Sequence, residues 1–211
     1  MNLQEFNSLI ELYFYQAKKQ NNQSDFLEWL NPKEKIKYTW AETTSNIQKL
    51  SLTIKKNIKD GDRCLLISEN RPEWLISDIA IMLANGITVP AYTTYTEKDY
   101  KYLVEDCEPS LVIVSNKLMH DKLQNIIKEN SFIKKIITFD KLKNVNYEKN
   151  YIHFNSIIKK KLEDKDKIKN LSLKRESPAC IIYTSGTGGN PKGVILSHGG
   201  ILNNLEGANE I

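Results

Sequence analysis

Residues 183–194 combine the groups that chemistry on phosphates requires. The run carries hydroxyls, small residues and one cation, namely Thr184, Ser185, Gly186, Thr187, Gly188, Gly189 and Lys192. Small residues let a backbone turn tightly, and successive N–H groups in such a turn form a concavity that favours anions. A lysine ammonium is a mobile point charge suited to phosphate. The run therefore indicates a phosphate-binding loop, with an ordinary glycine-rich surface turn as the alternative.

The common nucleotide-binding motifs do not fit this loop. A Walker A loop requires glycine immediately before its lysine, and Pro191 stands there. The dinucleotide-binding pattern fails as well, because Pro191 occupies the place of its third glycine. The apolar runs 179–183 and 194–196 on either side are typical of buried strands. The loop is thus predicted to join two strands.

The run from Tyr183 to Val194, followed by Ile-Leu-Ser-His, resembles the phosphate-binding signature of the adenylate-forming (AMP-binding) enzymes. The usual signature has threonine where this chain has Gly188. The resemblance covers nearly the whole chain, through segments of similar order and spacing: residues 39–42, 61–63, 68–74 and 86–90. Residues 68–74, Ser-Glu-Asn-Arg-Pro-Glu-Trp, are especially similar to long-chain fatty acyl-CoA synthetases.

This resemblance implies that ATP activates a carboxylic acid, with a long-chain fatty acid as the expected substrate. The carboxylate would displace pyrophosphate to form an acyl-adenylate, and coenzyme A would then take the acyl group as a thioester. The loop residues would bind the β- and γ-phosphates, Lys192 would offset charge on pyrophosphate, and Thr184 would contribute a hydroxyl to Mg²⁺. No residue of the chain is assigned as catalytic.

Members of this family are several hundred residues longer than this chain of 211 residues. The expectation is therefore an N-terminal fragment that is inactive alone and needs the C-terminal remainder of the enzyme. Two alternatives stay open. One is an aryl- or medium-chain acyl-CoA synthetase, and the other is a truncated, non-catalytic module that binds phosphate or a partner.

The elements before the loop alternate between helical and strand patterns. Helices are expected over residues 5–19, from the capping box Thr39–Glu42 to a glycine cap at Gly61, from Pro72 to Ala84, after Thr96, and around 118–127. Short strands are expected at 35–38, 64–68, 87–90, 111–114 and 135–139. Such alternation predicts an α/β fold with a mainly parallel sheet flanked by helices, the incomplete N-terminal portion of the adenylate-forming fold.

The chain is expected to comprise a first α/β subdomain at 1–140, a charged connection at 141–176 and the start of a second subdomain at 177–211. The connection contains the lysine-rich stretch 159–170, whose interleaved acids favour a solvated segment over a phosphate-binding patch. Ser197 is expected to cap a last helix. His198 follows the loop closely, and a structural role is favoured over ligand contact.

Composition excludes several function classes. The net charge of +4 arises from 30 basic and 26 acidic residues, too balanced to indicate nucleic-acid binding, although weak peripheral membrane association stays open. Cys64, Cys107 and Cys180 are odd in number and lie in apolar surroundings, which favours reduced thiols in a cytoplasmic protein.

The match of Ser156–Lys159 to a β-lactamase motif lacks its companion motifs and is attributed to chance.

Overall fold

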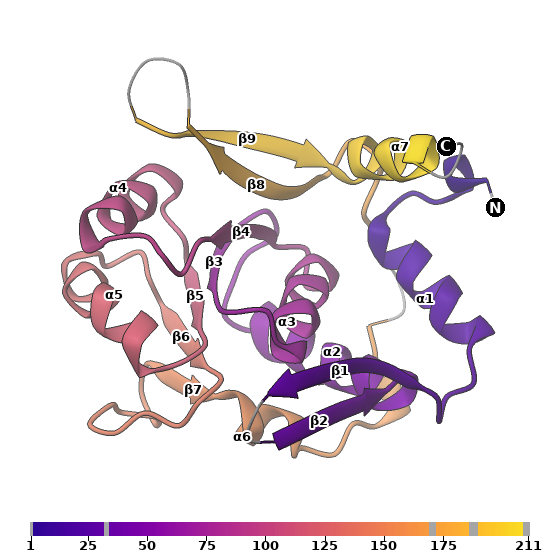
Figure 1. Ribbon diagram of the computed structural model, residues 1–211, viewed down its shortest axis with the longest axis horizontal. Helices are drawn as coiled ribbons and strands as arrows, with labels where there is room; N and C mark the ends of the chain where they lie inside the picture. The colour runs from indigo at the N-terminus through magenta and orange to yellow at the C-terminus, as the bar shows by residue number, and fades with distance from the viewer. Residues whose placement is uncertain (1, 32–33, 169–171, 186–189, 209–211) are drawn as a thin grey trace.

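The computed structural model describes residues 2–31, 34–168, 172–185 and 190–208 (Figure 1). In these residues, seven strands form one sheet, and two others form a separate antiparallel ribbon. Every neighbouring pair in the sheet is parallel except β8–β9, which is antiparallel. The structure confirms the predicted α/β class with a mainly parallel sheet.

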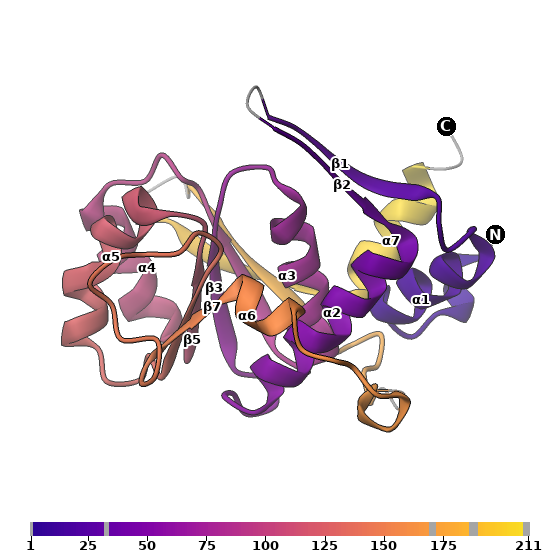
Figure 2. The same ribbon diagram turned by 90° about the horizontal axis from the view of Figure 1, so that it is seen from below.

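The sheet strands, from one edge to the other, are β7 (Tyr151–His153), β6 (Lys135–Thr138), β5 (Leu111–Val114), β3 (Arg63–Ile67), β4 (Ile87–Ala91), β8 (Pro178–Thr184) and β9 (Lys192–Ser197). The ribbon consists of β1 (Asp25–Asn31) and β2 (Glu34–Thr39), and it projects beyond the sheet (Figure 2). The α-helices are α1 (Leu9–Lys19), α2 (Trp40–Lys55), α3 (Pro72–Leu83), α4 (Glu97–Cys107), α5 (Lys117–Glu129), α6 (Phe154–Ile158) and α7 (His198–Ala208). Two 3₁₀ turns complete the described elements, η1 (Leu3–Glu5) and η2 (Asp164–Asp166).

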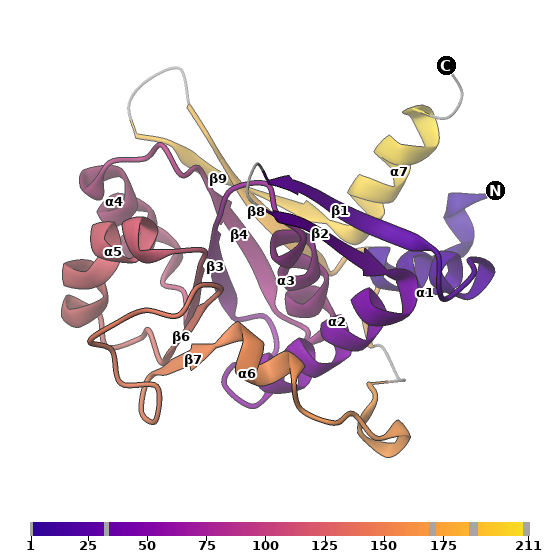
Figure 3. The same ribbon diagram turned by 60° about the horizontal axis from the view of Figure 1, so that its bottom comes forward.

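The central strands are covered by helices on both faces (Figure 3). Successive residues of a strand point to opposite faces, so Leu66 packs with α2 and α3 while Leu65 packs with α4 and α5. Because both faces of the sheet are buried, the sequence of each central strand is a continuous apolar run. The residues Leu111–Val114 are an example, and all four are fully buried. This rigid two-sided core holds the carboxyl ends of the parallel strands in fixed positions.

Local sequence signals set several helix starts as predicted. The Thr39 hydroxyl accepts from the Glu42 N–H, and the Glu42 carboxylate accepts from the Thr39 N–H, which completes the expected capping box. Thr96 and Asp99 form a second capping box at α4. Pro72 begins α3, where its missing N–H costs nothing. The Ser197 hydroxyl accepts from the Gly200 N–H at 3.1 Å, as expected for a cap of α7.

Two predicted helix boundaries were wrong. The first helix begins at Leu9 rather than residue 5, because Ser8 caps it and Leu3–Glu5 forms a 3₁₀ turn. The second helix ends at Lys55, so Gly61 does not cap it. Gly61 does adopt a left-handed conformation, with φ of 81°, and its N–H donates to the Asn85 carbonyl. Its role is therefore to turn the chain into β3.

Strands β1 and β7 were missed by the sequence patterns, and β9 is more exposed than expected. The side chains of Val194 and Ile195 are 44% and 63% exposed, because β9 lies at the edge of the sheet. The β1–β2 ribbon contacts Arg71 through a cation–π interaction, in which the guanidinium lies 4.8 Å from the centre of the Trp29 ring. Arg71 also forms a two-pronged ion pair with Glu73, at 2.9 and 3.0 Å.

The sheet continues across the predicted subdomain boundary at residue 177. Strand β8 pairs in parallel with β4 through Thr88 and Cys180, so both sides of that boundary share one sheet in the described residues. The division into subdomains at 1–140 and 177–211 with a connection between them stays a prediction. The connection itself contains β7, α6 and η2.

Candidate functional site

The predicted phosphate loop connects β8 to β9, two antiparallel strands at one edge of the sheet (Figure 1). Gly186, Thr187, Gly188 and Gly189 lie outside the described residues. Thr184 and Lys192 are direct cross-strand partners at the open end of the hairpin. Because opposed residues of an antiparallel pair point to the same face, the structure places the Thr184 and Lys192 side chains on one face of the hairpin. Ser185 follows Thr184, and all three of these residues are exposed.

Tyr183 and Gly193 form the cross-strand pair below Thr184 and Lys192. A Cβ atom on Gly193 would lie 2.9 Å from Ile181 Cγ2 and 3.2 Å from Tyr183 Cζ, so only glycine leaves the tyrosine ring room. The ring is 7% exposed, and its hydroxyl donates to the Asp106 carboxylate at 2.5 Å. Burial, followed by this hydrogen bond, raises the pKa of Tyr183, so the phenol remains a neutral donor.

A cavity of about 480 Å³ opens beside the hairpin at the carboxyl ends of three parallel strands. Ligands of parallel α/β sheets bind in this position, beyond the carboxyl ends of the strands. The walls come from the segments after β3 and β4 and from β8: Ser68, Glu69, Asn70, Trp74, Pro90, Ala91, Tyr92, Thr93, Tyr95, Ile182 and Tyr183. Its chemistry is mixed, with aromatic rings beside hydroxyls and one carboxylate.

Two side chains from α5 and the turn before it hold the walls of this cavity. The Asn116 side-chain amide donates to Glu69 at 2.7 Å, joining the segments that follow β5 and β3. The Lys122 ammonium donates to the carbonyls of Thr93 and Tyr95, at 2.9 and 2.8 Å. Sequence reasoning assigned no site role to these residues. The usable signal for Asn116 was its position just after the buried strand β5, whereas Lys122, within α5, had no such signal.

His198 begins α7, at the opposite end of β9 from the hairpin loop. Its side chain is fully buried, Nδ1 accepts from the Leu9 N–H at 3.4 Å, and Nε2 has no partner in the described structure. Burial lowers the pKa of His198 to about 4, so the imidazole is neutral at physiological pH. These contacts confirm the structural role that the sequence favoured.

The three cysteines are free thiols, and burial keeps them protonated. Cys64 and Cys107 are buried, and Cys180 is half-buried. Burial raises the pKa of Cys107 to about 12 and that of Cys180 to about 11. Because the thiolate is the reactive form, none of the three is poised as a nucleophile.

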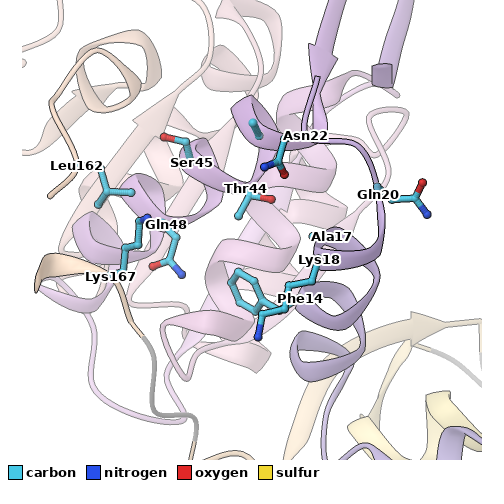
Figure 4. A pocket seen from close by; sticks show the side chains of 11 residues that line it. Phe14, Ala17, Lys18, Gln20, Asn22, Thr44, Ser45, Gln48, Leu162 and Lys167 are labelled. Carbon is cyan, nitrogen blue, oxygen red and sulfur yellow. The ribbon is translucent and has the colours of Figure 1, made fainter. Parts of the chain in front are cut away.

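A larger cavity of about 570 Å³ lies elsewhere, between α1, α2 and the segment around residue 162 (Figure 4). Two of its polar side chains, Gln48 and Lys167, already have protein partners. The Gln48 amide bonds both backbone groups of Ile168, at 2.9 and 3.2 Å. The Lys167 ammonium lies 2.6 Å from Asp164. Among the described residues, its lining includes no acid, histidine or cysteine, so no hydroxyl or lysine of this cavity has such a partner in the lining to activate it.

Within the described ranges, no three His, Cys, Asp or Glu side chains gather in a way that could hold a metal ion. Mg²⁺ commonly keeps several waters and uses substrate phosphates with one or two protein oxygens. An exposed Thr184 hydroxyl at the mouth of the hairpin fits such a minimal contribution. The helices of the described segments are also too short or too polar to cross a bilayer.

The fold is that of the adenylate-forming enzymes. The chain superposes on acetoacetyl-CoA synthetase from Streptomyces lividans with a TM-score of 0.81 at 16% identity, over 96% of this chain and 32% of that one. A luciferase-like enzyme from the mealworm Zophobas morio gives a TM-score of 0.80 at 19% identity, over 99% of this chain and 47% of that one. At these identities, the likeness establishes the fold alone.

Residues 14–211 match the family of AMP-binding enzymes, and the chain belongs to this family. It is 30% identical to Long chain acyl-CoA synthetase 3 of Arabidopsis thaliana over 183 residues, which is 83% of this chain and 28% of that protein. It is also 30% identical to Fatty acyl-CoA synthetase A of Dictyostelium discoideum, over 75% of this chain and 24% of that protein. The chain thus spans about a quarter of the length of these curated relatives.

Proposed function

We propose that this chain contributes the phosphate-binding part of an ATP-dependent acyl-CoA synthetase that acts on a long-chain fatty acid. The observation that carries the proposal is the pairing of Thr184 with Lys192 at the carboxyl edge of a parallel sheet. Family membership supports the reaction class, and the named relatives support the acyl substrate. Their greater length supports a division of labour with a further part of the enzyme.

The proposed reaction has two steps. A carboxylate oxygen attacks the α-phosphorus of ATP, the bond to the bridging oxygen breaks, and pyrophosphate leaves. The sulfur of coenzyme A then attacks the acyl carbonyl, AMP leaves, and the thiol proton passes to solvent. Both steps move negative charge onto phosphate, so alignment and charge neutralisation lower the barrier.

In this scheme, the loop residues bind the β- and γ-phosphates of ATP. The hydroxyls of Thr184, Ser185 and Thr187 donate hydrogen bonds, together with backbone N–H groups of Gly186, Gly188 and Gly189. The ammonium of Lys192 offsets charge on the departing pyrophosphate. Mg²⁺, when bound, neutralises the phosphate oxygens, with Thr184 as a protein ligand.

The exposed state of Lys192 supports this assignment. The Lys192 ammonium forms no ion pair with any described residue, so its charge is available to a bound phosphate. The adjacent cavity would take the remainder of the nucleotide or the acyl group. We further propose a cytoplasmic location, weak peripheral membrane contact and no nucleic-acid partner, in accord with the balanced charge.

The test is calorimetric titration of the chain with ATP and Mg²⁺. Lys192→Ala is expected to weaken binding at least about tenfold, which corresponds to about 1.4 kcal/mol. The matched control is Lys55→Ala, which removes an exposed lysine of α2 and changes net charge equally. Equal affinities for Lys192→Ala and Lys55→Ala would exclude the proposed role of Lys192.

A second measurement addresses catalysis and substrate. Pyrophosphate release by the 211-residue chain with ATP, Mg²⁺ and a fatty acid is expected to stay at background. Turnover at ordinary enzyme rates would overturn the proposed division of labour. A panel of long-chain, medium-chain and aryl acids, tested on the longer enzyme, then distinguishes the proposed substrate class from the alternatives.

A further inference from the structure

Helix α4 lies beside the loop end of the β8–β9 hairpin (Figures 1 and 3). It contacts the chain on both sides of the loop. On the incoming side, the Tyr183 hydroxyl donates to Asp106 at 2.5 Å. On the outgoing side, the Tyr102 hydroxyl donates to the carbonyl of Pro191 at 2.9 Å. The two anchored residues immediately precede Thr184 and Lys192 along the chain.

The two anchors on α4 are spaced to act together. Tyr102 and Asp106 are four residues apart, so they occupy neighbouring positions on one face of the helix. That face is turned toward the hairpin, since both side chains bond hairpin residues. The opposite face of α4 is fixed in the core by Tyr100, Leu103 and Val104, which are almost completely buried. The helix is therefore a rigid support for both ends of the loop.

The hairpin side of each contact is equally constrained. The Tyr183 ring packs over Gly193, which leaves its hydroxyl one direction, toward α4. Pro191 has a fixed φ angle, so anchoring its carbonyl limits where the following Lys192 can lie. A small cavity of about 90 Å³ lies between α4 and the hairpin, lined in part by Tyr102, Tyr183 and Pro191.

We propose that Tyr102 and Asp106 are positioning residues that fix Lys192 and Thr184, at the two ends of the phosphate loop, in place for binding a polyphosphate. The inference rests on the proposed function of the loop. Binding groups that are held in place beforehand lose less conformational freedom when the ligand binds, so Tyr102 and Asp106 raise affinity without touching the ligand. Removal of either anchor frees one end and weakens polyphosphate binding, while the fold stays intact.

The experiment measures the binding of inorganic tripolyphosphate to the 211-residue chain by calorimetry, together with stability to urea. Tyr102→Phe removes one hydroxyl and Asp106→Ala removes one acceptor. Each is expected to raise the Kd about three- to tenfold, in the range of one hydrogen bond. Asp106→Asn keeps an oxygen that can accept from Tyr183 and is expected to bind nearly as tightly as the unsubstituted chain.

The matched control is Tyr147→Phe. The Tyr147 hydroxyl also makes hydrogen bonds, to the Thr138 hydroxyl at 2.9 Å and to the Leu142 N–H at 2.8 Å. It lies beside β6, toward the edge of the sheet opposite the β8–β9 hairpin. This control is expected to lose stability without any change in Kd. A purely structural role for Tyr102 would give the same pattern as Tyr147→Phe and would overturn the inference.

The outcomes separate the inference from the proposed function. If the unsubstituted chain binds tripolyphosphate and Tyr102→Phe and Asp106→Ala bind equally well, the positioning role is refuted and the phosphate loop stands. If the unsubstituted chain does not bind tripolyphosphate, the proposed phosphate loop fails, and the positioning role fails with it. Asp106 is exposed, so Asp106→Ala keeps the test valid even if Tyr102→Phe perturbs folding.

Discussion

Acid is expected to destabilise this protein through His198. The imidazole is fully buried at the start of α7, where Nδ1 accepts a hydrogen bond from the Leu9 N–H. A proton on Nδ1 would point one donor at another and would place a charge in the apolar interior. For these reasons, the folded protein binds this proton weakly, with a pKa of about 4.

The sign and size of the effect follow from proton linkage. The pKa of an unfolded histidine is about 6.5, so the unfolded state binds more protons than the folded state between this value and about 4. Stability contributed by the neutral imidazole is therefore fully present above about pH 6.5 and is lost as pH falls toward 4. The free energy of unfolding should fall by about 2.5 kcal/mol between about pH 8 and pH 4.5 on account of this residue.

The assay is urea unfolding followed by circular dichroism, with the unsubstituted chain and His198→Gln compared across this pH range. The difference between the two free energies of unfolding isolates His198. Asp78 has the opposite effect, because burial raises its pKa to about 6 and its contribution to stability falls as pH rises through that range. Asp78 is present in both proteins, so its effect cancels in the difference.

A control variant and a clear negative result complete this test. His153→Gln replaces a half-buried histidine whose Nε2 already bonds the Phe139 carbonyl at 3.1 Å, and a smaller pH-dependent change is expected. If the unsubstituted chain and His198→Gln lose stability in parallel as the pH falls, the protonation of His198 does not govern acid sensitivity. The reasoning from its burial would then be refuted.

Two further predictions concern packing. Arg71→Ala leaves the Glu73 carboxylate, whose side chain is 9% exposed, without its ion-pair partner, and should cost about 3–5 kcal/mol in urea unfolding. Adding Glu73→Gln should recover part of this loss, because the buried charge is then removed. Gly193→Ala places a methyl group 2.9 Å from Ile181 Cγ2 and should cost about 1–3 kcal/mol in thermal unfolding.

The contrary outcomes are equally specific. A loss below about 1 kcal/mol for Arg71→Ala would mean that solvent replaces the lost partner and that the pair acts like a surface ion pair. For the glycine, the control is Gly200→Ala in α7, where the nearest atom, Ser197 Oγ, is 3.4 Å from the new Cβ. This control should be neutral or stabilising, since alanine favours a helix. Equal effects of the two substitutions would contradict the crowding argument.

The sequence by itself determined the features that depend on neighbours along the chain. The capping residues Thr39 and Thr96, the proline that begins α3, and the buried strands at 64–67 and 111–114 follow from local hydrogen bonding and apolar runs. The phosphate loop was predicted in the same way, from the types and order of residues 183–194. These signals also fixed the α/β class and, with the resemblance, the family.

Only the tertiary structure decided features that depend on distant partners. Strand β1 forms because it pairs with β2 and because Trp29 packs on Arg71, a contact with no local signal. The exposed apolar side chains of β9 follow from its place at the sheet edge, which the order of elements along the chain does not reveal. Tyr102 bonds Pro191, 89 positions away in sequence, and Asp106 bonds Tyr183, 77 positions away. Their proposed positioning role therefore has no local signal and depends on how α4 packs beside the hairpin.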